Sequence, residues 1–161
     1  MSAHPSVDAP KLARAGTLLT LLFFAGCRSL PPLPPADLAA TGWTVHQGQA
    51  VWKPNQFRPE LAGELILATN TNGDCLVEFT KTPFALASAR QCDDRWRVEF
   101  GAGRHAWQGR GPAPRQFSWF ELPRALAGDE LSRGWRFTRT NNSWRLANGR
   151  SGEWLEGAFL P

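Results

Sequence analysis

Apolar and polar residues alternate along most of this chain from Trp43 onward, and this period of two constrains the fold more than any other feature. In the segment 95–100, Trp96, Val98 and Phe100 fall on one face and charged residues fall on the other. Successive side chains of a strand point to opposite faces of a sheet, so the pattern predicts a strand with one buried and one solvated face. Ten segments of this kind are predicted as short strands: 43–52, 64–69, 75–80, 84–89, 95–100, 104–109, 116–121, 135–138, 144–146 and 153–159.

Turn and helix signals agree with a β-rich domain. The Asn-Gly pairs at 72–73 and 148–149 favour tight hairpins, because both positions tolerate positive φ. Residues 37–40 suit a short turn, and residues 123–128, with Pro first and Gly last, suit one or two helical turns. The sequence therefore predicts an all-β fold with one or two short helices, arranged as a barrel, an open barrel or a sandwich.

The N-terminal region has a different pattern, which ends at Cys27. Basic residues precede an apolar run over 17–26, whose last two residues are small. That run is half as long as the roughly 20 residues that a spanning helix needs, and a basic start before a short apolar core is typical of an export signal. Small residues before a cysteine are typical of bacterial lipoproteins. We expect residues 1–26 to be removed as a lipoprotein signal peptide and Cys27 to be lipidated; the alternative is an ordinary signal peptide with an incidental cysteine.

The residues after Cys27 predict a tether and a location. Residues 27–41 are rich in proline, which favours extended, semi-rigid polyproline II geometry. Arg28 and Ser29 follow the cysteine, and the absence of Asp there is typical of an outer-membrane address. Residues 42–161 then suit a single β-domain. We expect this domain to be lipid-anchored at the outer membrane and to face the periplasm.

Cys75 and Cys92 are candidates for a disulfide. An exported protein meets an oxidising compartment, and the stretch between the two cysteines has the pattern of a hairpin. The alternative is a pair of small buried thiols.

The sequence offers no positive evidence for catalysis, a metal or a cofactor. His46 and His105 lie far apart, and no His/Cys cluster has metal-ligand spacing. Residues 101–106 match Gly-x-Gly-x-x-Ala, but a strand pattern follows where dinucleotide binding needs a helix, so a hairpin turn is the better interpretation. The acidic pairs at 93–94 and 129–130 fall in predicted turns. The formal net charge of +4 is spread along the chain, which argues against a nucleic-acid surface.

Taken together, a lipidated cysteine, a proline-rich tether and short antiparallel strands resemble the LolA/LolB family of outer-membrane lipoprotein carriers, and LolB-like proteins in particular. The closest segment is 63–86, where Pro83 and Phe84 match a proline and a large apolar residue that begin an exposed loop in such proteins. Residues 152–157 resemble the end of these domains. The resemblance implies an antiparallel half-open β-barrel whose concave face holds acyl chains, with Pro83 and Phe84 as a membrane-insertion loop.

The expected function combines the anchor with this resemblance. We expect a monomeric, non-enzymatic lipoprotein that accepts acyl chains of lipoproteins or other lipids from a periplasmic LolA-like carrier and helps to pass them to the membrane. The large inward residues would line the lipid site or fill a closed core: Trp96, Val98, Phe100, Trp119, Trp135, Phe137 and Trp144. The alternative function is a structural or interaction lipoprotein of the cell envelope with a filled barrel and no lipid transfer.

Overall fold

The computed structural model describes residues 30–161 with the exception of residue 142. The chain divides into residues 1–31 and a compact unit of residues 32–161, and the fold described below is that of the second unit. The predicted signal peptide and the predicted lipidation at Cys27 lie outside the described residues. Within the described part, no helix has the length and apolar character needed to cross a membrane.

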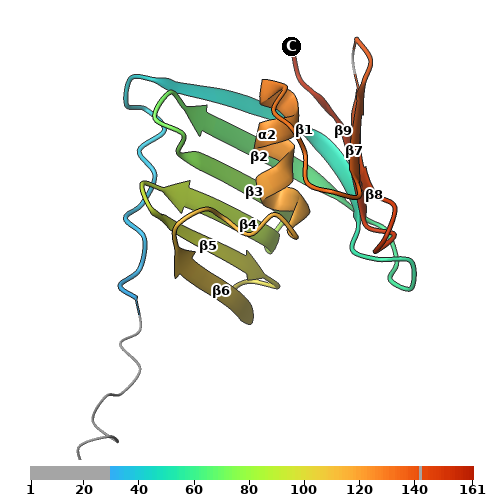
Figure 1. Ribbon diagram of the computed structural model, residues 1–161, viewed down its shortest axis with the longest axis horizontal. Helices are drawn as coiled ribbons and strands as arrows, with labels where there is room; N and C mark the ends of the chain where they lie inside the picture. Colours follow the sequence, from blue (N-terminus) through green and yellow to red (C-terminus); the bar gives the residue numbers. More distant parts are fainter. Residues whose placement is uncertain (1–29, 142) are drawn as a thin grey trace, which may run out of the picture. The chain divides into compact units, whose positions relative to one another are not determined.

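Nine antiparallel strands form one continuous sheet, in the order β6-β5-β4-β3-β2-β1-β9-β8-β7 (Figure 1). Consecutive strands from β1 to β6 pair with one another, and β9 returns to pair with β1. The all-β prediction is confirmed, but β6 and β7 remain as two unpaired edges of the described sheet, which is not closed into a barrel. The strands are β1 (Trp43–Lys53), β2 (Leu61–Asn70), β3 (Cys75–Lys81), β4 (Phe84–Cys92), β5 (Arg95–Phe100), β6 (His105–Arg110), β7 (Trp135–Arg139), β8 (Trp144–Asn148) and β9 (Trp154–Phe159).

The sheet bends sharply around β1, so that β7–β9 turn away from the plane of β2–β6 (Figure 1). Glycines make this close approach possible. A Cβ on Gly48 would lie 2.0 Å from the carbonyl oxygen of Ala158, and one on Gly157 would lie 2.4 Å from that of Gln49. Because no Cβ fits at either position, only glycine lets the backbones of β1 and β9 approach each other this closely. The sheet bends at these strands, and the bend gives it a concave face.

One helix, α2 (Ser118–Ala127), lies against the concave side of the sheet (Figure 1). The prediction of a strand over 116–121 is therefore wrong, and the helix predicted at 123–128 begins five residues earlier, at Ser118, with Pro123 inside it. The physical reason is burial: Trp119 and Leu122 are fully buried and Phe120 is 4% exposed, so the contacts of the helix with the sheet outweigh the local alternation. The predicted stop is confirmed, since Gly128 ends the helix at φ +84°.

The core fills most of the space between α2 and the sheet. The ring of Trp119 stacks on Phe79 with centroids 5.5 Å apart and meets Trp52 edge-on at 5.0 Å. The surrounding inward positions of the strands are occupied by aliphatic side chains with 1% exposure or less: Leu65, Leu67, Val77, Ala89, Val98, Leu146 and Leu155. The inward faces predicted from the alternation are thus confirmed as core.

Two carboxylates fix α2 in place. The Oε1 atom of Glu153, from the β8–β9 turn, accepts hydrogen bonds from Ser118 Oγ at 2.6 Å and from Trp52 Nε1 at 3.1 Å. Burial raises the pKa of the Glu153 carboxyl, and the two hydrogen bonds partly oppose this rise. The fully buried Glu121 accepts from the backbone N–H of Ser132 at 3.1 Å and from its Oγ at 2.6 Å. The start of the helix is therefore bound to β1 and the β8–β9 turn, and its middle to the segment that leads into β7.

Candidate ligand-binding site

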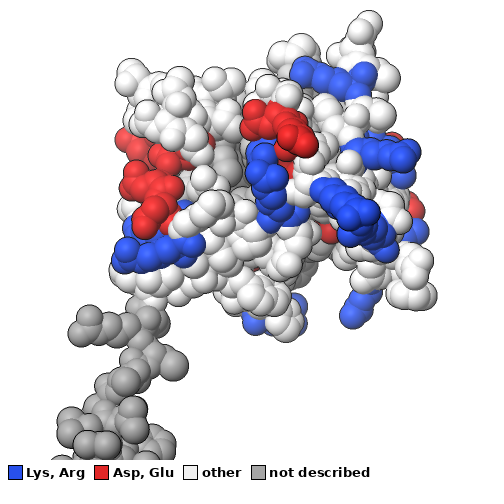
Figure 2. Space-filling model, viewed as in Figure 1, with Lys and Arg blue, Asp and Glu red and all other residues white. Residues whose placement is uncertain are grey.

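A cavity of about 510 Å³ lies between α2 and the part of the concave face near the β2–β3 turn. Its floor includes Leu67 and Cys75 from neighbouring strands, and its helical wall includes Phe120 and Leu126. The recess is visible beside α2 in Figure 2. This volume falls within the range of about 300–1,000 Å³ that is typical of sites for small organic molecules.

The rim of the cavity is polar and carries both signs of charge. Arg115 and Arg124 lie in the lining together with Asp74 and Asp129. The Nη2 atom of Arg124 donates to the backbone carbonyl of Glu130 at 2.9 Å, which holds its side chain near the end of α2. The apolar side chains of Leu67, Phe120 and Leu126 beside this polar rim suit an amphipathic ligand, with its chain against them and its headgroup at the rim.

The seven large residues predicted to line a lipid site do not border this cavity. Val98, Trp119, Trp135 and Trp144 are core residues, and Trp96, Phe100 and Phe137 are half-buried against that core. Trp119 also belongs to α2 rather than to a strand. The reason is that alternation identifies which side chains face inward but not which element covers them, and here the helix covers them.

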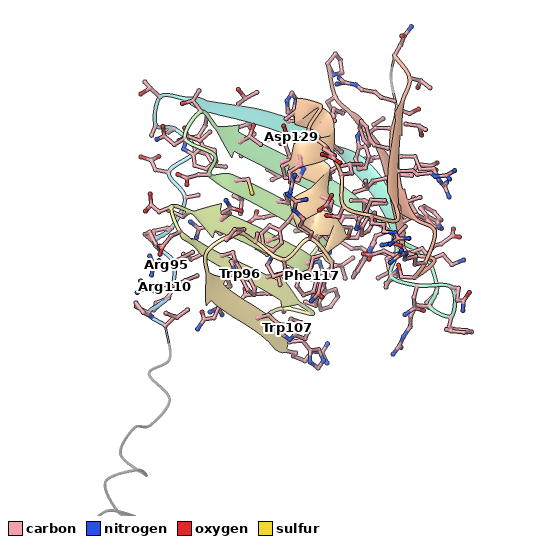
Figure 3. The ribbon with its side chains drawn as sticks, in the orientation of Figure 1. Arg95, Trp96, Trp107, Arg110, Phe117 and Asp129 are labelled. Carbon is pink, nitrogen blue, oxygen red and sulfur yellow. The ribbon has the colours of Figure 1, made fainter. Side chains whose placement is uncertain are left out.

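Sequence reasoning missed an aromatic cluster at the β6 edge of the sheet. Trp107 of β6 lies with its ring centroid 5.9 Å from Phe100 and 6.0 Å from Phe117, which precedes α2. Figure 3 places Trp96, Trp107 and Phe117 in the same region, away from Asp129. Trp107 remains 47% exposed. The signal that could have indicated this cluster was the alternation within β6, which places Trp107 on the inward face, together with the position of β6 at an edge of the sheet.

Pro83 and Phe84 form part of the β3–β4 hairpin. Thr82 and Pro83 make the turn, and Phe84 is the first residue of β4. The Phe84 side chain is 66% exposed and projects from this end of the sheet without a place in the core. The geometry leaves its ring available for contact with another molecule or a surface.

The predicted disulfide is not formed, and both Cys75 and Cys92 are free. In the β3–β4 register Cys75 lies opposite Gln91, so Cys92, one residue further on, points to the other face of the sheet. Burial raises the pKa of the Cys75 thiol to about 11. Burial, followed by the carboxylates of Asp74 and Asp93, also raises the pKa of Cys92.

Two other features have simple structural explanations. Residues 101–104 form the turn between β5 and β6, which confirms the hairpin interpretation of the glycine motif. Near the β2–β3 and β4–β5 turns, ligand atoms of Asp74, Cys92 and Asp93 lie within 4.8 Å of one another. The backbone N–H of Asp93 donates to Asp74 Oδ1 at 2.9 Å, so the cluster ties one turn to the other.

Comparison with known proteins assigns no family to this fold. A scan against protein-family models finds no match to the chain, and a search of curated proteins also finds none. The resemblance to LolA/LolB carriers therefore stays a prediction.

Proposed function

We propose that this protein is a membrane-anchored lipoprotein that binds acyl chains in the cavity beside α2 and takes part in moving lipids or lipoproteins to the outer membrane. The observation that carries the proposal is the cavity of about 510 Å³, whose lining combines the apolar Leu67, Phe120 and Leu126 with a polar rim. Cys27, which follows the predicted signal peptide, supplies the expected anchor.

The proposed mechanism is transfer between apolar sites of different affinity. An acyl chain that enters the cavity would cover Leu67, Phe120 and Leu126, and each Å² of apolar surface removed from water contributes roughly 25 cal/mol. The headgroup would remain at the rim beside Arg115 and Arg124. No bond is made or broken, so the direction of transfer depends on the relative affinities of the donor, this protein and the membrane.

The finer aspects of the proposal concern the architecture and the delivery step. We interpret the bent sheet, open between β6 and β7 and filled by α2, as a half-open barrel of the LolA/LolB kind. A periplasmic LolA-like carrier is the proposed donor. Phe84, with two thirds of its surface exposed, is the proposed contact with the membrane during delivery.

Displacement of a fluorescent fatty acid tests ligand binding. The chain from residue 27 on, carrying Cys27→Ser, is titrated in detergent-free buffer, with Ala127→Trp as the cavity variant. Ala127 is an exposed residue at the end of α2 and lies in the cavity wall, so an indole there would occupy the site without disturbing the core. Ala106→Trp is the matched control, because Ala106 is equally an exposed alanine but lies on β6, outside the cavity.

The proposal expects saturable binding that Ala127→Trp weakens and Ala106→Trp leaves unchanged. Absence of saturable binding, or equal weakening by both variants, contradicts it. Such a result favours a second candidate function, a structural or interaction lipoprotein of the envelope, which is supported by the complete burial of Trp119 within the concave face. Incorporation of labelled palmitate, compared between the natural chain and Cys27→Ser, tests the anchor separately.

A further inference from the structure

Several turns lie at one end of the sheet, and the pairing of the strands identifies that end. Lys53 at the end of β1 pairs with Trp154 at the start of β9, and Trp154 also pairs with Ala147 of β8. The β1–β2 and β8–β9 turns touch, since a Cβ on Gly152 would lie 3.1 Å from Gln56 Cβ. We call this the basic end, and it consists of the connections 54–60, 82–83, 101–104 and 149–153 with their flanking residues, and of residues 131–134 before β7.

Exposed cations gather at the basic end. Each of its connections carries or adjoins an exposed basic side chain, and none of these five has an ion-pair partner among the described residues: Arg58, Lys81, Arg104, Arg133 and Arg150. The connections contain only two acidic residues. Glu60 lies 3.6 Å from Lys53 Nζ, and Glu153 is engaged by Ser118 and Trp52. The basic end therefore has a local excess of positive charge.

The opposite end of the sheet has a different character. The β2–β3 and β4–β5 turns there carry Asp74, Asp93 and Asp94. In Figure 2 acidic side chains gather toward the left, where these turns lie in Figure 1, with basic side chains directly below them, whereas most charged side chains toward the right are basic. Arg95 and Arg110 lie at the same end, with Arg110 Nη1 3.7 Å from Asp94 Oδ2, so the charges there nearly balance. The excess of positive charge is therefore confined to the basic end.

The same basic end carries exposed aromatic rings. Phe57 in the β1–β2 turn is 86% exposed, Phe84 beside the β3–β4 turn is 66% exposed, and Trp107 near the β5–β6 turn is 47% exposed. Aromatic side chains next to cations are typical of surfaces that sit at a membrane interface, where the rings enter the headgroup region and the cations meet phosphates. We propose that the basic end docks on an anionic phospholipid surface and orients the domain against it.

This inference does not depend on the cavity, and its test excludes both the anchor and a bound fatty acid. The chain from residue 27 on, carrying Cys27→Ser and thus without the predicted signal peptide, is mixed with vesicles of phosphatidylcholine alone, or with phosphatidylglycerol as a third of the lipid, and bound protein is measured by flotation. Binding to the anionic vesicles is expected to exceed binding to the neutral ones by about tenfold or more and to fall as salt is added, because salt screens exposed charges.

Matched triple variants locate the contact. Arg58→Gln, Arg104→Gln and Arg150→Gln together remove three cations from the basic end, and a loss of about tenfold or more in vesicle binding is expected, since each cation near an anionic surface contributes about fivefold. The control removes the same net charge from exposed arginines that lie outside both the basic end and the cavity: Arg110, Arg139 and Arg145, each changed to Gln. The control is expected to change binding by no more than about twofold.

Phe57→Ser tests the aromatic part of the surface, because this side chain is almost fully exposed and has no role in the core. It is expected to weaken binding to anionic vesicles while leaving the melting temperature unchanged. Equal binding to neutral and anionic vesicles, or an equal loss in both triple variants, would overturn the inference. Since fatty-acid displacement is measured without vesicles, failure of docking and failure of acyl-chain binding remain distinguishable.

Discussion

Replacement of Trp119 by alanine tests whether α2 fills the concave face as a packed element. Trp119 has no exposed surface and touches Phe79 and Trp52 at ring-centroid distances of 5.5 and 5.0 Å. Truncation of a buried tryptophan costs about 3–5 kcal/mol through lost contacts and the cavity left behind. A partial compensation is expected, because Trp119 Nε1 is buried without a hydrogen-bond partner among the described residues, and removal of such a neutral donor returns about 1 kcal/mol.

The net destabilisation by Trp119→Ala is therefore expected to be about 2–4 kcal/mol, a large part of the roughly 5–15 kcal/mol available to a domain of this kind. At about 4 °C per kcal/mol, the melting temperature should fall by roughly 8–16 °C. Trp119→Phe keeps a ring against Phe79 and removes the unpaired N–H, so its cost should be below about 1.5 kcal/mol.

Thermal unfolding of the Cys27→Ser chain, followed by near-ultraviolet circular dichroism, measures both variants. Trp107→Ala serves as the comparison, because about half of this tryptophan is exposed and its truncation should cost less than that of Trp119. If Trp119→Ala melts within about 3 °C of the parent chain, or if Trp119→Phe is as damaging as Trp119→Ala, then α2 is not packed in the groove as described.

Three further predictions follow from individual side chains. Because the folded state raises the pKa of Glu153, the free energy of unfolding should fall as the pH rises from the ordinary carboxyl pKa through the raised pKa. Glu153→Gln keeps the acceptor for Ser118 and Trp52 and should remove this pH dependence in urea titrations at several pH values. An unchanged pH dependence would contradict the assignment. In the Cys27→Ser chain at pH 8, a maleimide should label Cys92 well before the buried Cys75, and recovery of a Cys75–Cys92 disulfide after mild oxidation would refute the register described for β3 and β4. Phe84→Glu should leave fatty-acid affinity unchanged but reduce delivery of lipid to vesicles from the loaded protein, and undiminished delivery would exclude the proposed membrane contact.

The strands could be predicted from the sequence because their information is local. The alternation in Arg95–Phe100 yields the observed bounds of β5, and the Asn-Gly pair at 72–73 falls in the β2–β3 turn. In both cases the side chains that specify the element are the ones within it. The prediction of ten strands fails at one segment only, residues 116–121.

Residues 116–121 show why the start of α2 was not predicted. Phe117 and Trp119 alternate with polar neighbours as a strand would, and Pro123 indicated that a helix could begin there but not extend before it. Trp119 and Leu122 are three residues apart, as on one face of a helix, but this spacing favours a helix only when a concave sheet is present to bury both side chains. The stabilising contacts are with strands distant in the sequence, so no local pattern contains them.

The candidate site is the least predictable part of the molecule. Its lining combines residues from β1 to β4, the loop after β6 and α2, and it exists because the helix leaves one part of the concave face uncovered. The seven aromatic and aliphatic residues expected to form it do face inward, but α2 packs over this side of the sheet, so they belong to the core or pack against it instead of lining the cavity. The position of α2 on the sheet, rather than the composition of the strands, determines where the cavity lies.

Photo-crosslinking with a diazirine-bearing fatty acid tests the central claim most directly. After illumination of the Cys27→Ser chain and proteolysis, mass spectrometry should find the label on the walls of the cavity, in peptides that contain Leu67, Cys75 or the helix residues Phe120 and Leu126. An excess of unlabelled fatty acid should abolish this labelling. Labelling confined to the exposed Trp107 edge, or labelling that competitor does not reduce, would contradict acyl-chain binding in the cavity.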